Sequence, residues 1–162
     1  MLTIDRAAQV LDYCQRTGVF VWKINASSRR PIGSIAGKID KDGYRVIRID
    51  GKNYRAGRLA YFMSYGHWPS ELIDHVNGDR LDDSLKNLRE ASYRQNCQNS
   101  IVHKNSSSRK KGVDYHKRDG AWRARIRVDG KRVFLGNFPT PELAHAAYVQ
   151  AASALHGEFA RT

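Results

Sequence analysis

The sequence predicts an α+β protein built from small antiparallel sheets, each followed by a helix. Four Asp-Gly dipeptides, at positions 42–43, 50–51, 119–120 and 129–130, lie between segments rich in β-branched or aromatic residues. In such a setting Asp-Gly favours a tight hairpin turn. Apolar residues then recur at helical spacing over residues 56–65 and 141–156. With 162 residues, of which 41% are hydrophobic, the chain can bury one moderate core or two small ones.

The first half of the chain is expected to hold a small antiparallel sheet between residues 18 and 55. Its strands are predicted near residues 19–23, 35–39, 44–49 and 52–55. The stretch AGRLAYFMSYG that follows places Leu59, Phe62 and Met63 on one helical face, and Gly66 can end the helix. We therefore interpret this helix as part of the core and its aromatic side chains as packing residues.

Residues 112–162 show a pattern of three strands and one helix. Within AWRARIRV, apolar residues alternate with arginines, so one face of this strand is apolar and the other is a row of guanidinium groups. The apolar positions are Trp122, Ala124, Ile126 and Val128, and the basic ones are Arg123, Arg125 and Arg127. In the next strand, KRVFLGNF, we expect Val133 and Leu135 to point inward. Arg132 and Phe134 would then point outward.

A helix is predicted to start at Pro141, because Thr140 is a favoured cap and proline is a favoured first helical residue. Gly157 predicts its end. Apolar residues recur in it at about four-residue spacing, at Leu143, Ala147, Ala151 and Leu155. We expect this side of the helix to cover the apolar face of the sheet, which leaves the arginine face open.

A polar, serine-rich and basic stretch, SIVHKNSSSRKKG, begins after Asn99. Its composition is typical of a linker, so we expect domains at residues 1–99 and 112–162, joined by a linker at 100–111. This linker either follows a phosphate backbone or is an ordinary solvated tether. Its basic residues are His103, Lys104, Arg109, Lys110 and Lys111.

The charge of the chain favours a polyanionic partner. The sequence has 28 Lys and Arg against 16 Asp and Glu, a formal charge of +12, as is typical of nucleic-acid-binding proteins. Cys14 and Cys97 form no CxxC pair, so the sequence predicts neither a zinc site nor a disulfide framework. No stretch approaches transmembrane length, so we expect a soluble intracellular protein that does not engage a membrane.

One short region is acidic, in contrast to the positive net charge of the whole chain. Between Glu71 and Glu90, six acidic residues stand against three basic ones. Such a region is either a solvated acidic loop or a place where a cation bridges the protein and a phosphate.

Within this region, LIDHVNGDRLDDSLKNLREASYRQNCQN predicts a hairpin followed by a helix, with Asp74 and His75 ending the first strand. The Asp74 carboxylate and the Asn96 side-chain carbonyl are hard oxygen ligands suited to Mg²⁺ or Mn²⁺. An ordinary histidine, with a pKa of about 6.5, is mostly neutral near pH 7 and can accept a proton from water. Adjacent side chains on a strand diverge, so Asp74 and His75 could act on opposite sides of one phosphate.

The spacing of Asp74, His75, Asn87 and Asn96 resembles the HNH endonucleases of the His-Me finger (ββα-metal) superfamily, particularly phage and intron-encoded nicking enzymes. The resemblance implies a ββα-metal motif in which His75 is the general base and Asp74 and Asn96 bind the metal. Asn87 would hold the loop that orients the histidine. Asn99 is the alternative for the last ligand.

The stretch GVDYHKRDGAWRARIRVDGKRVFLGNFPTPELAHAAYVQAA resembles an AP2 DNA-binding domain. In that family, basic and aromatic side chains of the sheet contact bases and backbone, and Arg127, Arg132 and Phe134 match those contacts most directly. The sequence departs from the plant-type pattern at Arg125, where an acidic residue is usual, and at Phe134, where Trp is common. A target sequence therefore does not transfer. The full set of predicted DNA-binding residues is Arg123, Arg125, Arg127, Arg132, Phe134, Lys110 and Lys111.

These observations predict a Mg²⁺- or Mn²⁺-dependent endonuclease that hydrolyses phosphodiester bonds of double-stranded DNA. We expect a monomer without a protein partner that nicks one strand at a preferred site, in the cytoplasm of a bacterial host and encoded by a phage. The alternative is a sequence-specific DNA-binding regulator with an inactive HNH scaffold. An RNA-binding protein is less well supported, because no stretch of the sequence resembles an RRM or a KH domain.

Overall fold

The computed structural model describes residues 2–25, 27, 30–100, 102 and 106–160. The chain divides into two compact units, Met1–Tyr93 and Arg94–Thr162, and each is described here by itself. Both combine helices with small antiparallel sheets, which confirms the predicted α+β class. The stretch predicted as a linker falls within the second unit, and two of its basic residues, His103 and Lys104, lie outside the described residues. The predicted domain boundaries stay a prediction.

The first unit begins with a helix and a strand that the sequence analysis did not anticipate. Helix α1, Ile4–Val10, starts at Thr3, whose side chain accepts a hydrogen bond from the Arg6 amide, and it leads directly into β1, Leu11–Cys14. β1 pairs with β2, Val19–Trp22, in a two-stranded sheet. The strand predicted at residues 19–23 therefore pairs with β1 and not within the following sheet.

That following sheet has three antiparallel strands in the order β3-β4-β5: Lys38–Ile39, Arg45–Ile49 and Lys52–Arg55. The segment that leads into this sheet is bonded to β2 through the backbone. The Gly33 amide donates to the Trp22 carbonyl, and the Ala36 amide donates to the Phe20 carbonyl. The two sheets thus share one core. Phe20, Ile47 and Leu59 are among its fully buried side chains.

Helix α2, Ala56–Tyr65, confirms the predicted helix. Leu59 and Phe62 are buried, and Met63 packs against the same core. Gly66 ends the helix in the left-handed region, at φ 78°, and its amide donates to the Phe62 carbonyl over 2.9 Å. The glycine is needed here because other residues rarely adopt a positive φ.

A hairpin and a short helix follow α2, as predicted. β6, Leu72–His75, pairs antiparallel with β7, Leu88–Ala91, and a 3₁₀ turn, η1 (Leu85–Asn87), leads into β7. Helix α3, Tyr93–Gln98, comes next in the chain. Asp74 and His75 are the last two residues of β6.

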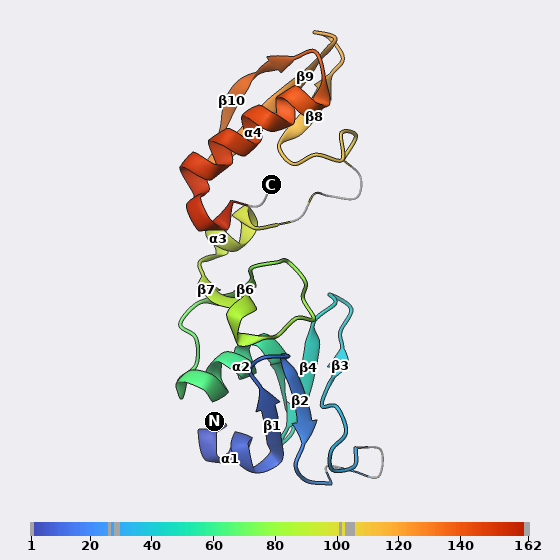
Figure 1. Ribbon diagram of the computed structural model, residues 1–162, viewed down its shortest axis with the longest axis vertical. Helices are drawn as coiled ribbons and strands as arrows, with labels where there is room; N and C mark the ends of the chain where they lie inside the picture. The colour runs from blue at the N-terminus through green and yellow to red at the C-terminus, as the bar shows by residue number, and fades with distance from the viewer. Residues whose placement is uncertain (1, 26, 28–29, 101, 103–105, 161–162) are drawn as a thin grey trace. The chain divides into compact units, whose positions relative to one another are not determined.

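The second unit contains a three-stranded antiparallel sheet in the order β10-β9-β8, covered by one long helix (Figure 1). Its strands are β8, Val113–His116, β9, Ala121–Val128, and β10, Lys131–Phe138. Helix α4, Pro141–His156, starts as predicted, with the Thr140 hydroxyl accepting from the Leu143 amide, and a 3₁₀ turn, η2 (Gly157–Phe159), follows it.

The buried side of α4 is shifted by one residue from the predicted one. Ala144, Tyr148 and Ala152 are buried against the sheet, whereas Leu143 and Leu155 are exposed. The large Tyr148 ring causes this rotation, because it packs over Gly112 so closely that a Cβ there would lie 2.0 Å from the ring.

The strands keep the predicted alternation with one exception. Ala124 and Ile126 of β9 are buried, and Leu135 of β10 packs into the core beside a β-bulge. The exception concerns exposure and not direction: Val133 lies opposite the buried Ile126, on the predicted inward side, but is 41% exposed. It lies near the β9–β10 turn, beyond the small buried clusters that Ala144, Tyr148 and Ala152 form with the sheet.

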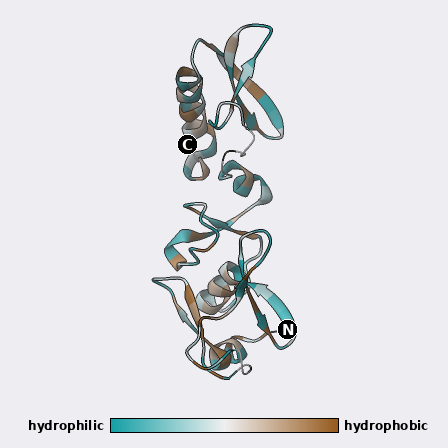
Figure 2. Cartoon of the chain, turned by 90° about the vertical axis from the view of Figure 1, so that its right-hand side faces the viewer, coloured by the Kyte–Doolittle hydropathy of each residue, from teal (hydrophilic) through white to brown (hydrophobic). Residues whose placement is uncertain are grey.

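Hydrophobic and hydrophilic segments follow one another closely along both units (Figure 2). Among the described residues, no helix is long and apolar enough to cross a membrane.

Candidate active site

Asp74 and His75 are both buried and have different partners. The Asp74 carboxylate accepts a hydrogen bond of 2.9 Å from Arg89 Nε, from the residue directly opposite on β7. His75 Nε2 lies 3.1 Å from Asp83 Oδ1. The two neighbours on β6 therefore engage different groups, in agreement with the expectation that their side chains diverge.

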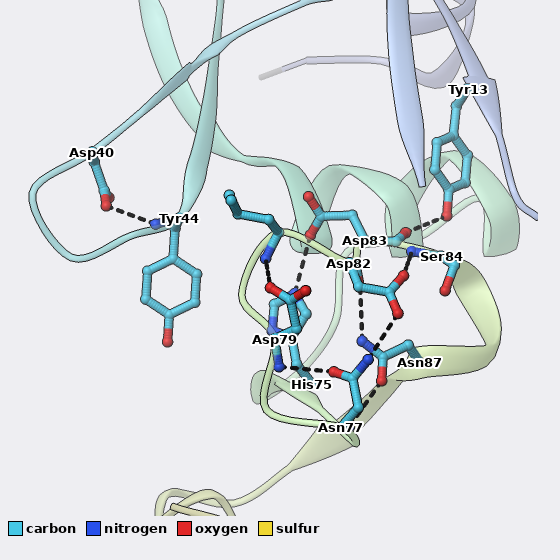
Figure 3. A network of polar contacts seen from close by, with 11 residues as sticks. Tyr13, Asp40, Tyr44, His75, Asn77, Asp79, Asp82, Asp83, Ser84 and Asn87 are labelled. Atoms are coloured by element: carbon cyan, nitrogen blue, oxygen red, sulfur yellow. Dashed lines mark hydrogen bonds and ion pairs between the residues drawn. The ribbon is translucent and has the colours of Figure 1, made fainter. Parts of the chain in front are cut away.

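The loop between β6 and η1 is held by its own acidic and amide side chains (Figure 3). Asn77 Oδ1 accepts from the Asp79 amide over 2.8 Å, and Asp79 Oδ1 accepts from the Leu81 amide over 2.9 Å. Asn77 Nδ2 donates to Asp82 Oδ2 over 2.8 Å. Hydrogen bonds from Ser84 and Asn77 hold the pKa of the Asp82 carboxyl below its usual value. Much of the acidic region thus serves to shape this loop.

Asn87 closes the loop from the other side. Its Oδ1 accepts from the Asn77 amide over 2.9 Å, and its Nδ2 donates to the Asp82 carbonyl over 2.7 Å. The Asn87 side chain is buried, so these bonds are partly shielded from water. The amide thereby ties together the two ends of the loop that surrounds His75.

Asp83 is a site residue that the sequence analysis missed. Its carboxylate is buried beside His75, and its backbone carbonyl accepts a 2.8 Å hydrogen bond from the Tyr13 hydroxyl of β1. Burial raises the pKa of Tyr13, so the phenol stays protonated and can donate. The acidic pair Asp82-Asp83 was visible in the sequence, but nothing local distinguished the buried carboxylate from the solvated one.

Two arginines near His75 were also not anticipated. Arg55 and Arg80 both lie over the Tyr44 ring, with guanidinium carbons 4.2 and 5.0 Å from its centroid. The Tyr44 ring centroid is in turn 6.0 Å from that of His75. Exposed cations beside a buried histidine are well placed to attract an anion such as a phosphodiester.

The remaining predicted ligands lie in the second unit. Asn96 is half-buried on α3, and Asn99 is buried just after it. The described residues contain no group of three or more His, Cys, Asp or Glu side chains that could hold a metal. By type, the predicted ligands are hard oxygens, one from a carboxylate and the others from side-chain amides, and such oxygens suit a cation that completes its shell with water and phosphate.

Some of the predicted DNA-binding arginines of the second unit form ion pairs with a carboxylate, and others do not. Arg123 Nη2 and Arg125 Nη2 contact the two oxygens of Asp114 on β8, at 2.7 and 2.6 Å. Burial raises the pKa of Asp114, but the hydrogen bonds from Arg123 and Arg125 outweigh this and lower the pKa overall. Arg127 and Arg132 are exposed, and in the described part of the chain neither guanidinium is paired with a carboxylate.

Several of these cations line one hollow of about 510 Å³. Its basic lining residues are Lys110, Lys111, Arg125, Arg127 and Arg132. Lys110 Nζ also lies 3.6 Å from Glu142, and Lys111 Nζ donates to the Gln98 carbonyl. Phe134 is 58% exposed on β10, as predicted.

Comparison with known families assigns both halves of the chain. Residues 54–98 match the model of an HNH endonuclease, and residues 108–158 match that of an AP2 domain. The chain is 35% identical to Protein 3.8 of Escherichia phage T7 over 91 residues, which are 55% of this chain and 73% of that protein. The chain belongs to the HNH endonuclease family, with an AP2 domain at its C-terminal end.

A second relative has the same family name. The chain is 32% identical over 123 residues to an uncharacterised HNH endonuclease of Acanthamoeba polyphaga mimivirus. The match covers 75% of this chain and 63% of that protein. The HNH match includes α2, the hairpin of Asp74 and His75, and α3. The AP2 match includes the sheet with its arginines and α4.

Proposed function

We propose that this protein is a divalent-metal-dependent endonuclease that nicks one strand of double-stranded DNA at a preferred site. The observation that carries the proposal is His75, a buried histidine at the end of a strand, held by a carboxylate and neighboured by the exposed cations Arg55 and Arg80. In the proposed reaction His75 accepts a proton from water, whose oxygen attacks the phosphorus.

Asp74 and Asn96 are the residues that we propose to hold Mg²⁺ or Mn²⁺, with Asn99 as the alternative to Asn96. When bound, such a cation stabilises negative charge on the phosphate oxygens and the leaving O3′. The Asp74 carboxylate is paired with Arg89, so a bound cation would share the carboxylate with Arg89. Asn87 supports the reaction indirectly, by holding the loop through Asn77 and Asp82.

For the AP2 domain we propose binding to double-stranded DNA through the exposed arginine face. Arg127, Arg132 and Phe134 are the proposed contacts to bases and backbone, and Lys110 and Lys111 are proposed contacts to phosphates. Arg123 and Arg125 complete the set, at a position where Asp114 already neutralises part of their charge.

A single Asp-His pair in the sequence supports nicking by a monomer, because one site acts on one strand at a time. The charge of +12 opposes self-association without DNA. We further propose that the protein acts in the cytoplasm of a host cell and is phage-encoded. The viral origin of both relatives supports this last point.

The proposal is tested by incubating the full chain with supercoiled plasmid and Mg²⁺, in parallel with the same mixture containing EDTA. Strand breakage is expected only without EDTA. Tight binding to DNA without breakage, over a range of Mg²⁺ and Mn²⁺ concentrations, would instead support the sequence-specific regulator with an inactive HNH scaffold.

A further inference from the structure

We propose that Asp83 is a positioning residue for His75 and determines which of its ring nitrogens accepts the proton. This inference rests on the proposed nuclease function. His75 Nε2 and Asp83 Oδ1 are 3.1 Å apart, and the two side chains are only 7% and 2% exposed. The contact joins residues eight positions apart and is the one hydrogen bond that the structure describes for the Asp83 carboxylate.

Burying the Asp83 carboxylate costs folding free energy, and its packing contacts do not explain why a carboxylate is placed there. Asp83 Oδ2 is inaccessible to solvent and has no hydrogen-bond partner among the described residues. Burying an incompletely paired carboxylate is strongly unfavourable, and a neutral polar or apolar residue would avoid that penalty. A role in orienting the adjacent histidine accounts for its presence.

The surrounding elements are built to bring these two groups together. Gly57, in the first turn of α2, lies over the pair, and a Cβ there would be 3.1 Å from Asp83 Oδ1 and 3.5 Å from His75 Cε1. Tyr13 anchors the Asp83 carbonyl from β1, and Asn87 anchors the carbonyl of the preceding residue, Asp82. The position of Asp83 is therefore fixed from both directions along the chain.

The chemistry follows from the hydrogen-bonding capacity of the two groups. An ionised carboxylate can only accept hydrogen bonds, so His75 must carry its proton on Nε2 to donate to Asp83. The other nitrogen, Nδ1, is then the proton acceptor. In the cleavage step a proton moves from water to Nδ1, the water oxygen bonds to phosphorus, and the bond from phosphorus to O3′ breaks. The leaving O3′ takes a proton from solvent, and no proton is transferred to Asp83.

The first test is a double-mutant cycle on single-turnover DNA cleavage with Mg²⁺. Asp83→Asn keeps the size of the side chain but allows the wrong tautomer, so we expect cleavage to slow about 10²- to 10⁴-fold with DNA affinity unchanged. If Asp83 acts through His75, Asp83→Asn/His75→Ala cleaves no slower than His75→Ala. Losses that multiply would overturn the proposal.

Asp79→Asn is the matched control. It removes one carboxylate from the same loop and keeps an acceptor for the Leu81 amide, and the described structure shows no hydrogen bond between Asp79 and His75. Cleavage by this variant is expected to stay within about threefold of wild type. An equal loss in Asp79→Asn and Asp83→Asn would show that loop charge, and not positioning, is what matters.

The second test needs no cleavage and no altered Asp83. In the metal-free full chain with ¹⁵N-labelled histidine, the signals of His75 are identified by their loss in His75→Ala. In the neutral imidazole we expect Nε2 to be protonated and Nδ1 not. A proton on Nδ1 overturns the proposal even if Asp83→Asn fails to fold. If His75→Ala cleaves like wild type, the proposed function itself fails, whichever tautomer is found.

Discussion

Arg127 on β9 and Arg132 on β10 lie directly opposite each other in the antiparallel pair, and the structure describes no carboxylate partner for either guanidinium. Like charges at directly opposite positions destabilise a sheet. Further along β9, Arg125 and Arg123, two and four residues before Arg127, share Asp114. The sheet therefore carries one pair of arginines whose charge is partly neutralised within the protein and one pair that a polyanion would neutralise.

We expect Arg127→Ala and Arg132→Ala each to weaken binding to a preferred duplex by about 1–3 kcal/mol, if the arginines contact bases. Without DNA, neither substitution should lower the free energy of unfolding, because each removes a repulsion. Fluorescence anisotropy and chemical denaturation measure the two effects. A uniform loss over all DNA sequences, with a shallower salt dependence, would assign the arginines to phosphate contacts.

Acid should weaken the second unit through Asp114. Its pKa is lowered in the folded state, so its contribution to stability is present above the pKa of the unfolded chain, about 3.9, and is lost as pH falls through the lower folded value. Wild type and Asp114→Asn should differ in unfolding free energy at pH 6 or so and converge in strong acid. A difference that persists at the lowest pH would contradict this origin.

Asp74→Asn separates the metal role of Asp74 from its structural one. The amide oxygen can still accept from Arg89, but the substitution removes the charge that neutralises this largely buried arginine, so we expect a folded protein with lower thermal stability. As the substitution removes the only anionic ligand that we propose, the Mg²⁺ concentration for half-maximal cleavage should rise at least tenfold. An unchanged metal titration would exclude Asp74 from the ligand set.

Asn87→Ala tests how the loop is held. The substitution leaves the partly buried Asn77 amide and Asp82 carbonyl without their side-chain partner, which destabilises the loop. We expect faster hydrogen exchange at the Asn77 amide and slower cleavage. Unchanged exchange there, with cleavage lost, would indicate that Asn87 acts directly on the substrate.

Local signals in the sequence predicted much of the fold. Asp-Gly turns and alternation located β4, β5, β9 and β10, and Gly66 and Thr140 marked the end of α2 and the start of α4. α1 and β1 are short, and the helix passes into the strand without a turn signal, so neither was predicted. The rotation of α4 depends on Tyr148 packing over Gly112, a contact between residues far apart in sequence.

The sequence also located part of the candidate site. Asp74, His75 and Asn87 belong to one motif with characteristic spacing, and the structure places all three in or beside one hairpin. Asp83 and the Tyr44 cluster were not predicted, because their relevance depends on which side chains fold against His75. An acidic pair in a polar loop gives no local sign of which carboxylate will be buried.

The most direct test of the account compares wild type with His75→Ala on supercoiled plasmid in the presence of Mg²⁺. We predict that wild type converts supercoiled plasmid to open circles well before linear DNA forms. His75→Ala should produce no open circles while binding the same DNA within a few-fold, because the base acts in the transition state. Cleavage by His75→Ala at near wild-type rate, or linear DNA as early as open circles, would contradict a His75-dependent nicking enzyme.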